Sequence, residues 1–138
     1  MILASLLSLG VPLEDFRQAI NNLKLRVDIK VSKASSRGFS GLRVEVVVPK
    51  NSAGRTFSEV ESTIKKSRLE AEVKENALKI FKRLFEAESR VHGRSFRTTH
   101  LHEAAADDAL VDIVGACWLL RRLQVAEVYF SPVNLGSG

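Results

Sequence analysis

The apolar run ALVDIVGACWLL, residues 109–120, decides how this chain folds. Acidic residues precede the run and Arg121 and Arg122 follow it, so the charges at both ends complement the dipole of a helix. The run is apolar nearly all the way round a helix, which is typical of a helix buried on several sides. We therefore expect a central helix from about Ala104 to Leu123, with the other elements packed around it.

Two helices and a pair of strands are predicted upstream of this run. Residues 1–9, MILASLLSL, read as a buried helix, and residues 13–23 place apolar side chains at helical spacing. Residues 25–32 and 42–48 alternate apolar with polar side chains, as half-buried strands do. The polar connection between them contains Gly38, so an antiparallel hairpin is the simplest interpretation.

Two capping-box patterns predict the starts of two further helices. TxxE at residues 56–59 precedes a short helix, and SxxE at residues 67–70 precedes a long helix that runs to about Val91. Gly93 follows in the position where glycine commonly ends a helix. The long helix carries a broad apolar stripe, which is far more often core than a cofactor-binding surface.

The stretch EVYFSPV, residues 127–133, resembles a last strand, which Pro132 ends. The predicted order of elements is then ααββαααβ. This order indicates the α+β class, with a small antiparallel or mixed sheet packed against several helices.

Composition and charge narrow the classes of partner. The formal net charge is +5 and the pI is about 9.7, which favours anionic partners such as nucleotides. The basic residues are scattered and few aromatic residues interleave with them, which argues against nucleic-acid binding. The apolar start is too short to span a membrane and lacks the basic region of a signal peptide. The single cysteine, Cys117, suits a reducing cytosol and a place in the core.

The stretch HLHEAAADDALVDIVG, residues 100–115, carries the candidate functional residues. His100 and His102 are two apart, which in an extended segment directs both side chains to the same side. Imidazoles placed this way can share a transition-metal ion such as nickel or zinc, and Glu103 follows them directly. The pattern HxHE differs from the helical HExxH zinc motif. No nucleophilic triad, phosphate-binding glycine loop or CxxC occurs, so the catalytic residues are unassigned.

A pair of aspartates continues this candidate site. Asp108 and Asp112 lie one turn apart on a helix, where like charges cost about 0.2–0.5 kcal/mol unless something positive lies between them. A metal ion, a magnesium-bound phosphate or an arginine from another segment could each supply the positive charge between them. In the alternative interpretation, Glu103, Asp107 and Asp108 only complement the start of the helix, and Asp112 pairs with an arginine. The two histidines would then be surface groups or a subunit contact.

Five pieces of the chain carry a family resemblance: MILASLLSLGVPLE, RGFSGLRVEV, EVKENALKIFKRLFEAESRVHG, HLHEAAADDALVDIVGA and VYFSPVNLGSG. In this order they resemble the N-terminal domain of the nickel insertion proteins of nickel-pincer cofactor biosynthesis. These proteins are also called pyridinium-3,5-bisthiocarboxylic acid mononucleotide nickel chelatases. The pieces cover nearly the whole chain, and the series EAESRVHG, HxHE, DxxxDIVG and SPxxLGSG is specific as a combination.

This resemblance implies a cytoplasmic enzyme of the lyase class, a nickel chelatase or cyclometallase, that inserts nickel into the pyridinium mononucleotide. It also implies CTP with a divalent cation, Mg or Mn, and a product that is the prosthetic group of lactate racemase. The family's GSG, expected to bind substrate, falls on Gly136 and Gly138. The family's HxHE and DxxxD positions, expected to bind the metal, fall on His100, His102, Glu103, Asp108 and Asp112.

The chain departs from the family pattern in several places. Of the family's first strand and the motif ending in Gly-Asp-Met, only Met1 remains, and KNSAGR, residues 50–55, stands where many members have a histidine-rich loop. Ala104-Ala105 and Asp107 also differ from the usual residues. We expect residues 1–138 to form a single α+β domain. It would be an N-terminal domain that lacks its first strand and the CTP-binding C-terminal region, its partner in the same protein.

Two rival hypotheses complete the sequence-based reading. In the first, the domain is structural, has no activity by itself, and packs or forms a homo-oligomer around the central helix. In the second, weaker one, the basic surface binds RNA, and that binding would weaken as salt rises.

Overall fold

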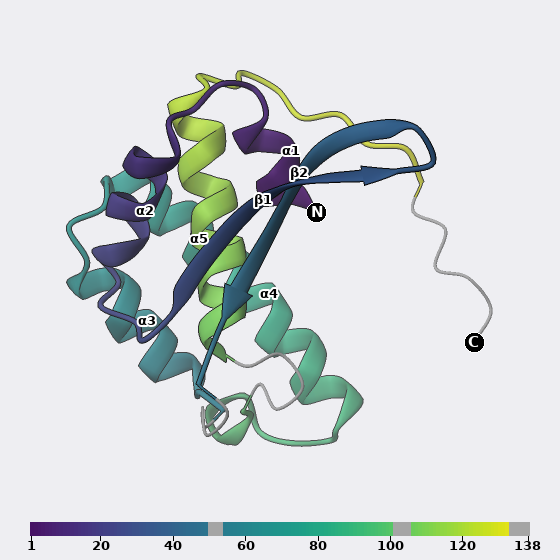
Figure 1. The fold of residues 1–138 in the computed structure, drawn as a ribbon. Helices are drawn as coiled ribbons and strands as arrows, with labels where there is room; N and C mark the ends of the chain where they lie inside the picture. Colours follow the sequence, from purple (N-terminus) through teal and green to yellow (C-terminus); the bar gives the residue numbers. More distant parts are fainter. Residues whose placement is uncertain (50–53, 101–105, 133–138) are drawn as a thin grey trace.

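Helix α5 (Ala106–Arg122) runs through the middle of the molecule, as its apolar sequence predicts. The computed structural model describes residues 1–49, 54–100 and 106–132. Within them α5 contacts α1, α2, α4 and β2, and α3 packs on α4. Figure 1 shows α5 at the centre, with α2 and α3 beside it and the β1–β2 hairpin crossing in front. The other elements are α1 (Ile2–Leu7), α2 (Leu13–Asn21), β1 (Asp28–Ser36), β2 (Phe39–Val47), α3 (Phe57–Lys66), α4 (Ala71–Val91) and the 3₁₀ helix η1 (Phe96–Thr98).

The core forms where the apolar faces of α1, α2 and α4 meet α5 and where α3 packs on α4. Leu110, Val111, Val114 and Leu119 of α5 are fully buried. The stripe predicted on the long helix is buried as expected, at Val73, Ala77, Phe81 and Phe85. These aliphatic and aromatic groups leave water together, which is the main force that stabilises the fold.

Gly115 lets α1 and α2 approach α5 closely. A Cβ at this position would lie 3.0 Å from Cε2 of Phe16 and 3.1 Å from Cδ2 of Leu3. Such distances are tighter than ordinary carbon contacts, so the glycine creates the space that the Phe16 ring occupies.

The predicted hairpin is confirmed, but it is longer than the apolar alternation indicates. Ser36 pairs with Phe39 across a two-residue turn, in which Arg37 has φ 50° and Gly38 has φ 83°. Positive φ at both central positions is the type I′ geometry that matches the twist of the strands. The alternation stops early because the hairpin tip extends past the helices into solvent. There the backbone pairing continues although no side chain needs to be buried.

One of the two predicted capping boxes forms. Thr56 and Glu59 make a reciprocal box at the start of α3. Ser67 does not cap the long helix: its buried hydroxyl donates to the Ile64 carbonyl at 2.7 Å and so ends α3 instead. Helix α4 therefore begins later, after Glu70, without a side-chain cap.

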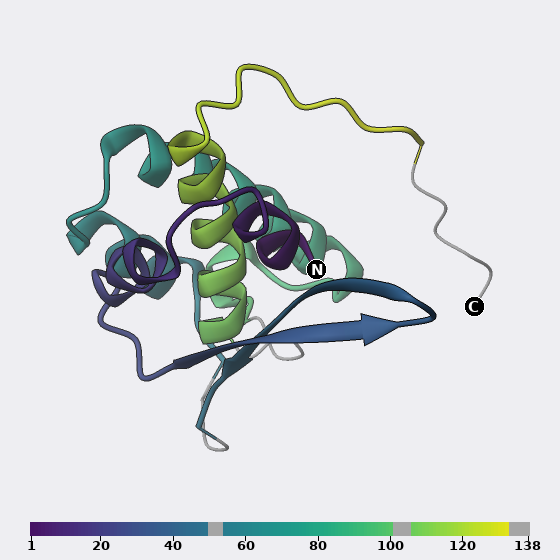
Figure 2. The same ribbon diagram turned by 45° about the horizontal axis from the view of Figure 1, so that its top comes forward.

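The predicted last strand is wrong over its described part, residues 127–132. This segment leaves α5 in extended form and pairs with no strand among the described residues. Figure 2 shows it running away from the helices. Val128, Tyr129 and Phe130 are exposed, at 64%, 85% and 86%. Strand-like residues form a strand only beside a partner, and the described sheet contains only β1 and β2. The α+β class itself is confirmed.

The length and apolar character of the helices bear on whether any of them could cross a membrane. In the described parts of the chain, none of them combines the length and the apolar character that crossing a membrane requires.

Candidate functional site

The first residue of the candidate stretch lies beside the start of α3. His100 forms an isolated antiparallel backbone bridge with Thr56, which is the N-cap of α3. The bridge joins two segments that are far apart in the sequence. It also brings His100 to the end of the molecule where α5 begins.

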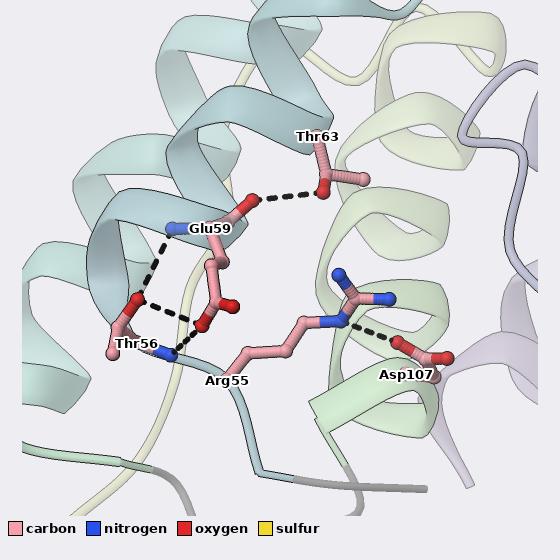
Figure 3. Close-up of polar contacts among 5 residues, drawn as sticks. All are labelled: Arg55, Thr56, Glu59, Thr63 and Asp107. Carbon is pink, nitrogen blue, oxygen red and sulfur yellow. Dashed lines mark hydrogen bonds and ion pairs between the residues drawn. The ribbon is translucent and has the colours of Figure 1, made fainter.

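The residue before that N-cap connects the same region to α5. The Arg55 Nε donates to Oδ1 of Asp107 at 2.6 Å, and Figure 3 shows the guanidinium directed at the first turn of α5. The Asp107 side chain is only 12% exposed and that of Arg55 is 29% exposed. A charge buried this far needs a partner, so Asp107 does more than complement the helix dipole.

The capping box fixes the backbone between Arg55 and α3. The Thr56 backbone N–H and hydroxyl both donate to Oε2 of Glu59, at 2.7 and 2.8 Å, and the Glu59 N–H donates to the Thr56 hydroxyl at 3.3 Å. Figure 3 shows this box beside the ion pair. The hydrogen bonds from Thr56 lower the pKa of Glu59, and the positive charge of Arg55 acts in the same direction.

Asp108 and Asp112 lie one turn apart near the start of α5, as predicted, and they repel each other. The side chain of Asp112 reaches solvent, but partial desolvation and the charge of Asp108 raise its pKa, while the Met1 amino group opposes the shift. Among the described residues, no arginine or lysine forms an ion pair with Asp112. An arginine from another segment was one of the partners predicted for these aspartates, but Arg55, which reaches the start of α5, pairs with Asp107 instead.

Four of the seven expected site residues lie outside the described residues. This applies to His102, Glu103, Gly136 and Gly138. In the described ranges no three His, Cys, Asp or Glu side chains come close enough together to hold a metal ion. His100, Asp108 and Asp112 alone therefore form no such cluster.

Arg55 is the residue near this site that sequence reasoning missed. It belongs to the segment KNSAGR, residues 50–55, for which the sequence predicts no functional role. A signal was present: Arg55 directly precedes an N-cap, and the start of the central helix carries more acids than the helix dipole alone needs. The pairing itself depends on how two distant segments meet, which spacing does not encode.

Two residues outside the site, Gly93 and Cys117, behave as predicted, and His92 lies beside the first of them. His92 is the C-cap of α4, and its Nε2 lies 3.2 Å from Oε1 of Glu88. Gly93 follows with φ 59°. Cys117 is buried, and burial raises the pKa of its thiol, which makes it an unreactive core residue.

A cavity of about 1010 Å³ lies at the opposite end of α5. Its walls come from α4, from the second half of α5 and from residues 124–128. The lining is mixed, with apolar and basic side chains such as Ile80, Arg83, Leu120, Arg121 and Val125. Since neither His100 nor the aspartates of α5 line it, this cavity is separate from the candidate site.

The fold and the site together define an α+β protein in which His100 and several aspartates lie near the point where a central helix begins. The sequence profile of the family described as "Nickel insertion protein" matches residues 1–138. The chain belongs to the nickel insertion protein family, which confirms the resemblance seen in the sequence.

Similar proteins come from archaea and bacteria. A protein of Archaeoglobus fulgidus, provisionally named nickel insertion protein, is 39% identical over the whole chain, and the match covers 35% of that protein. The pyridinium-3,5-bisthiocarboxylic acid mononucleotide nickel insertion protein of Clostridium kluyveri is 34% identical over the whole chain, which corresponds to 38% of its length. This chain thus spans little more than a third of these relatives. No solved structure matches it.

Proposed function

We propose that this chain takes part in inserting nickel into pyridinium-3,5-bisthiocarboxylic acid mononucleotide, as the N-terminal domain of a longer protein. The match to the Clostridium kluyveri protein over the whole chain supports this substrate. The proposal includes the chemistry that the resemblance implies: a cytoplasmic lyase that uses CTP with Mg or Mn and makes the cofactor of lactate racemase. We propose that CTP binds to the remaining part of the longer protein, which lies outside the region that corresponds to this chain.

Nickel is the cargo of this reaction, and we propose that the start of α5 receives it. The proposed ligands are His100, His102, Glu103, Asp108 and Asp112, while Gly136 and Gly138 would contact the substrate. The observation that carries this proposal is the repulsion between Asp108 and Asp112, for which the described residues supply no ion-pairing arginine or lysine.

The chemistry of nickel fits these side chains. A divalent cation between Asp108 and Asp112 would turn their repulsion into attraction, and it would favour the ionised form of Asp112. Imidazole is a good ligand for nickel, and carboxylate oxygens can complete the coordination. The anionic mononucleotide would approach a chain whose net charge is +5.

Calorimetric titration of nickel into this chain tests the proposal. We expect binding that is lost in a His100→Ala/His102→Ala variant and weakened in an Asp108→Asn/Asp112→Asn variant. The matched control is His92→Ala, because it removes the third histidine at the end of α4 and should leave binding unchanged. Equal nickel affinity in the parent and the His100/His102 variant would remove this site from consideration.

A second candidate function, a structural or self-associating domain, is favoured by the exposed apolar segment after α5. Val128, Tyr129 and Phe130 expose most of their surface, which is unusual for neighbouring apolar residues. Sedimentation velocity separates the two candidates. Association that a Tyr129→Ser/Phe130→Ser variant abolishes, in a chain that binds no nickel, would favour the structural role.

A further inference from the structure

We infer that Arg55 is a positioning residue for the proposed nickel site, because its ion pair with Asp107 links the backbone that holds His100 to the start of α5. This inference rests on the proposed function for its consequence, nickel affinity. Figure 3 shows the part of the link that runs from Asp107 through Arg55 to Thr56, and the backbone bridge from Thr56 to His100 completes it.

Two contacts in series make the link. The side chain of Arg55 contacts α5 through Asp107, at 2.6 Å. The backbone of the next residue, Thr56, pairs with His100. Asp108 follows Asp107 directly in the chain. A proposed histidine ligand and a proposed aspartate ligand are therefore held at the two ends of one short path.

Hydrogen bonds hold the middle of this path to α3. Both the backbone N–H and the hydroxyl of Thr56 bond to the Glu59 carboxylate, and Thr63 donates to the Glu59 carbonyl at 2.8 Å. These contacts bind Thr56 to α3 and do not involve α5. The Arg55–Asp107 pair is a salt bridge between this path and α5. Removing it would leave the α3 cap intact while freeing α5 to shift relative to His100.

Arginine suits this role better than lysine. The contact uses Nε, which lies part-way along the side chain and donates in the plane of the guanidinium. A lysine keeps the positive charge but has no donor at that position. Groups that orient the ligands of a metal, without binding it, typically change metal affinity by about 10–100-fold when they are removed.

The other end of α5 supplies a matched control. The Nε of Arg121 lies 2.9 Å from Oε2 of Glu72 on α4, so it also joins α5 to a neighbouring element. The Arg121 side chain is 46% exposed and lies far along the helix from Asp108. Arg121→Ala removes the same charge without touching the path to His100.

The experiment compares nickel titrations of the chain with those of Arg55→Ala, Arg55→Lys and Arg121→Ala. Arg55→Ala should weaken binding about 10–100-fold, Arg55→Lys should fall between that variant and the parent, and Arg121→Ala should change affinity less than about twofold. Ile64→Val is a control for stability, since it alters the buried face of α3 and leaves the path intact. If Arg55→Ala fails to fold, Asp107→Asn replaces it, because this change weakens the same contact and keeps the shape of the side chain.

Hydrogen exchange separates a failure of this inference from a failure of the proposed function. Arg55→Ala should speed exchange in the first turns of α5, while Arg121→Ala and Ile64→Val should not speed it there. Parent-like nickel affinity and parent-like exchange in folded Arg55→Ala would overturn the inference and leave the proposed function standing. Two other results would contradict the proposed function: no nickel binding by the parent, or equal binding by the parent and the His100→Ala/His102→Ala variant. Either result would also contradict the predicted effect of Arg55 on nickel affinity. Exchange would then still decide whether Arg55 fixes the start of α5.

Discussion

The two ends of α5 use ion pairs in different environments. At the start, Asp107 is 12% exposed and binds Arg55 at 2.6 Å. At the end, Arg121 is 46% exposed and lies 2.9 Å from Glu72, and Arg122 reaches Asp15 at 3.5 Å with both side chains largely exposed. Exposed pairs contribute little because water and salt screen them, whereas a buried charge is costly to leave alone. The difference indicates that only the pair at the start fixes the position of neighbouring segments.

The largest loss of stability is expected from a substitution in the apolar core around the middle of α5. Phe81 of α4 is fully buried in the core around α5. Phe81→Ala should lower the free energy of unfolding by about 3–5 kcal/mol, because it removes buried surface and leaves a cavity. Urea denaturation followed by circular dichroism measures this loss. A cost below that of Arg55→Ala would mean that the polar start of α5 matters more than its core.

Breaking the part-buried Arg55–Asp107 pair should cause the next largest loss of stability. Arg55→Ala leaves the Asp107 carboxylate without its partner, so we expect a loss of about 1–3 kcal/mol. Comparison with Asp107→Ala and with the double variant isolates the interaction between the two side chains. Additive effects in this cycle would show that the pair contributes no coupling and would remove the contrast between the two ends.

Breaking an exposed pair should matter much less. Arg121→Ala should cost less than about 1 kcal/mol, because its contacts with Glu70 and Glu72 lie in solvent. The small cost should shrink further between low and high salt, whereas the cost of Arg55→Ala should depend less on salt. Urea denaturation at two ionic strengths checks both statements, and equal salt dependence would contradict the assignment of the two environments.

The smallest predicted effect has the opposite sign. Because the pKa of Asp112 is raised in the folded chain, the folded state holds this proton more tightly than the unfolded state does. The ionised Asp112 carboxylate therefore destabilises the folded state. This destabilisation is absent at a pH well below the ordinary pKa of 3.8, grows as pH rises through the raised folded pKa, and is complete above it. Asp112→Asn should then stabilise the chain at neutral pH by about 0.2–0.5 kcal/mol, the usual size of a like-charge pair one turn apart.

Denaturation of the parent and of Asp112→Asn across this pH range measures the effect. The gain should vanish in acid, and adding nickel should stabilise the parent more than the variant if Asp112 is a ligand. Asp15→Asn is a suitable control, because Asp15 lies on the surface at the other end of α5 and contacts Arg122. A gain in the variant that does not change with pH would contradict the electrostatic cause.

Local patterns predicted the elements of this protein well, and long-range contacts account for most of the errors. The helix that contains residues 109–120, the apolar stripe of α4, the Thr56–Glu59 cap and the end of α4 at Gly93 all follow from spacing over a few residues. The segment over residues 127–132 looks like a strand because its side chains suit one, but no local pattern shows whether a partner strand exists. Ser67 likewise fits two helix ends, and burial against α3 decided between them.

For the candidate site, the sequence by itself determined which side chains are available and on which helix turn the aspartates lie, because helical spacing is set by the backbone. The family, too, follows from the sequence alone. Only the tertiary structure decided that His100 lies against Thr56 and that Arg55 joins Asp107. Such contacts depend on how the packing of α3, α4 and α5 brings distant segments together, and a buried carboxylate then takes whichever cation that packing places beside it.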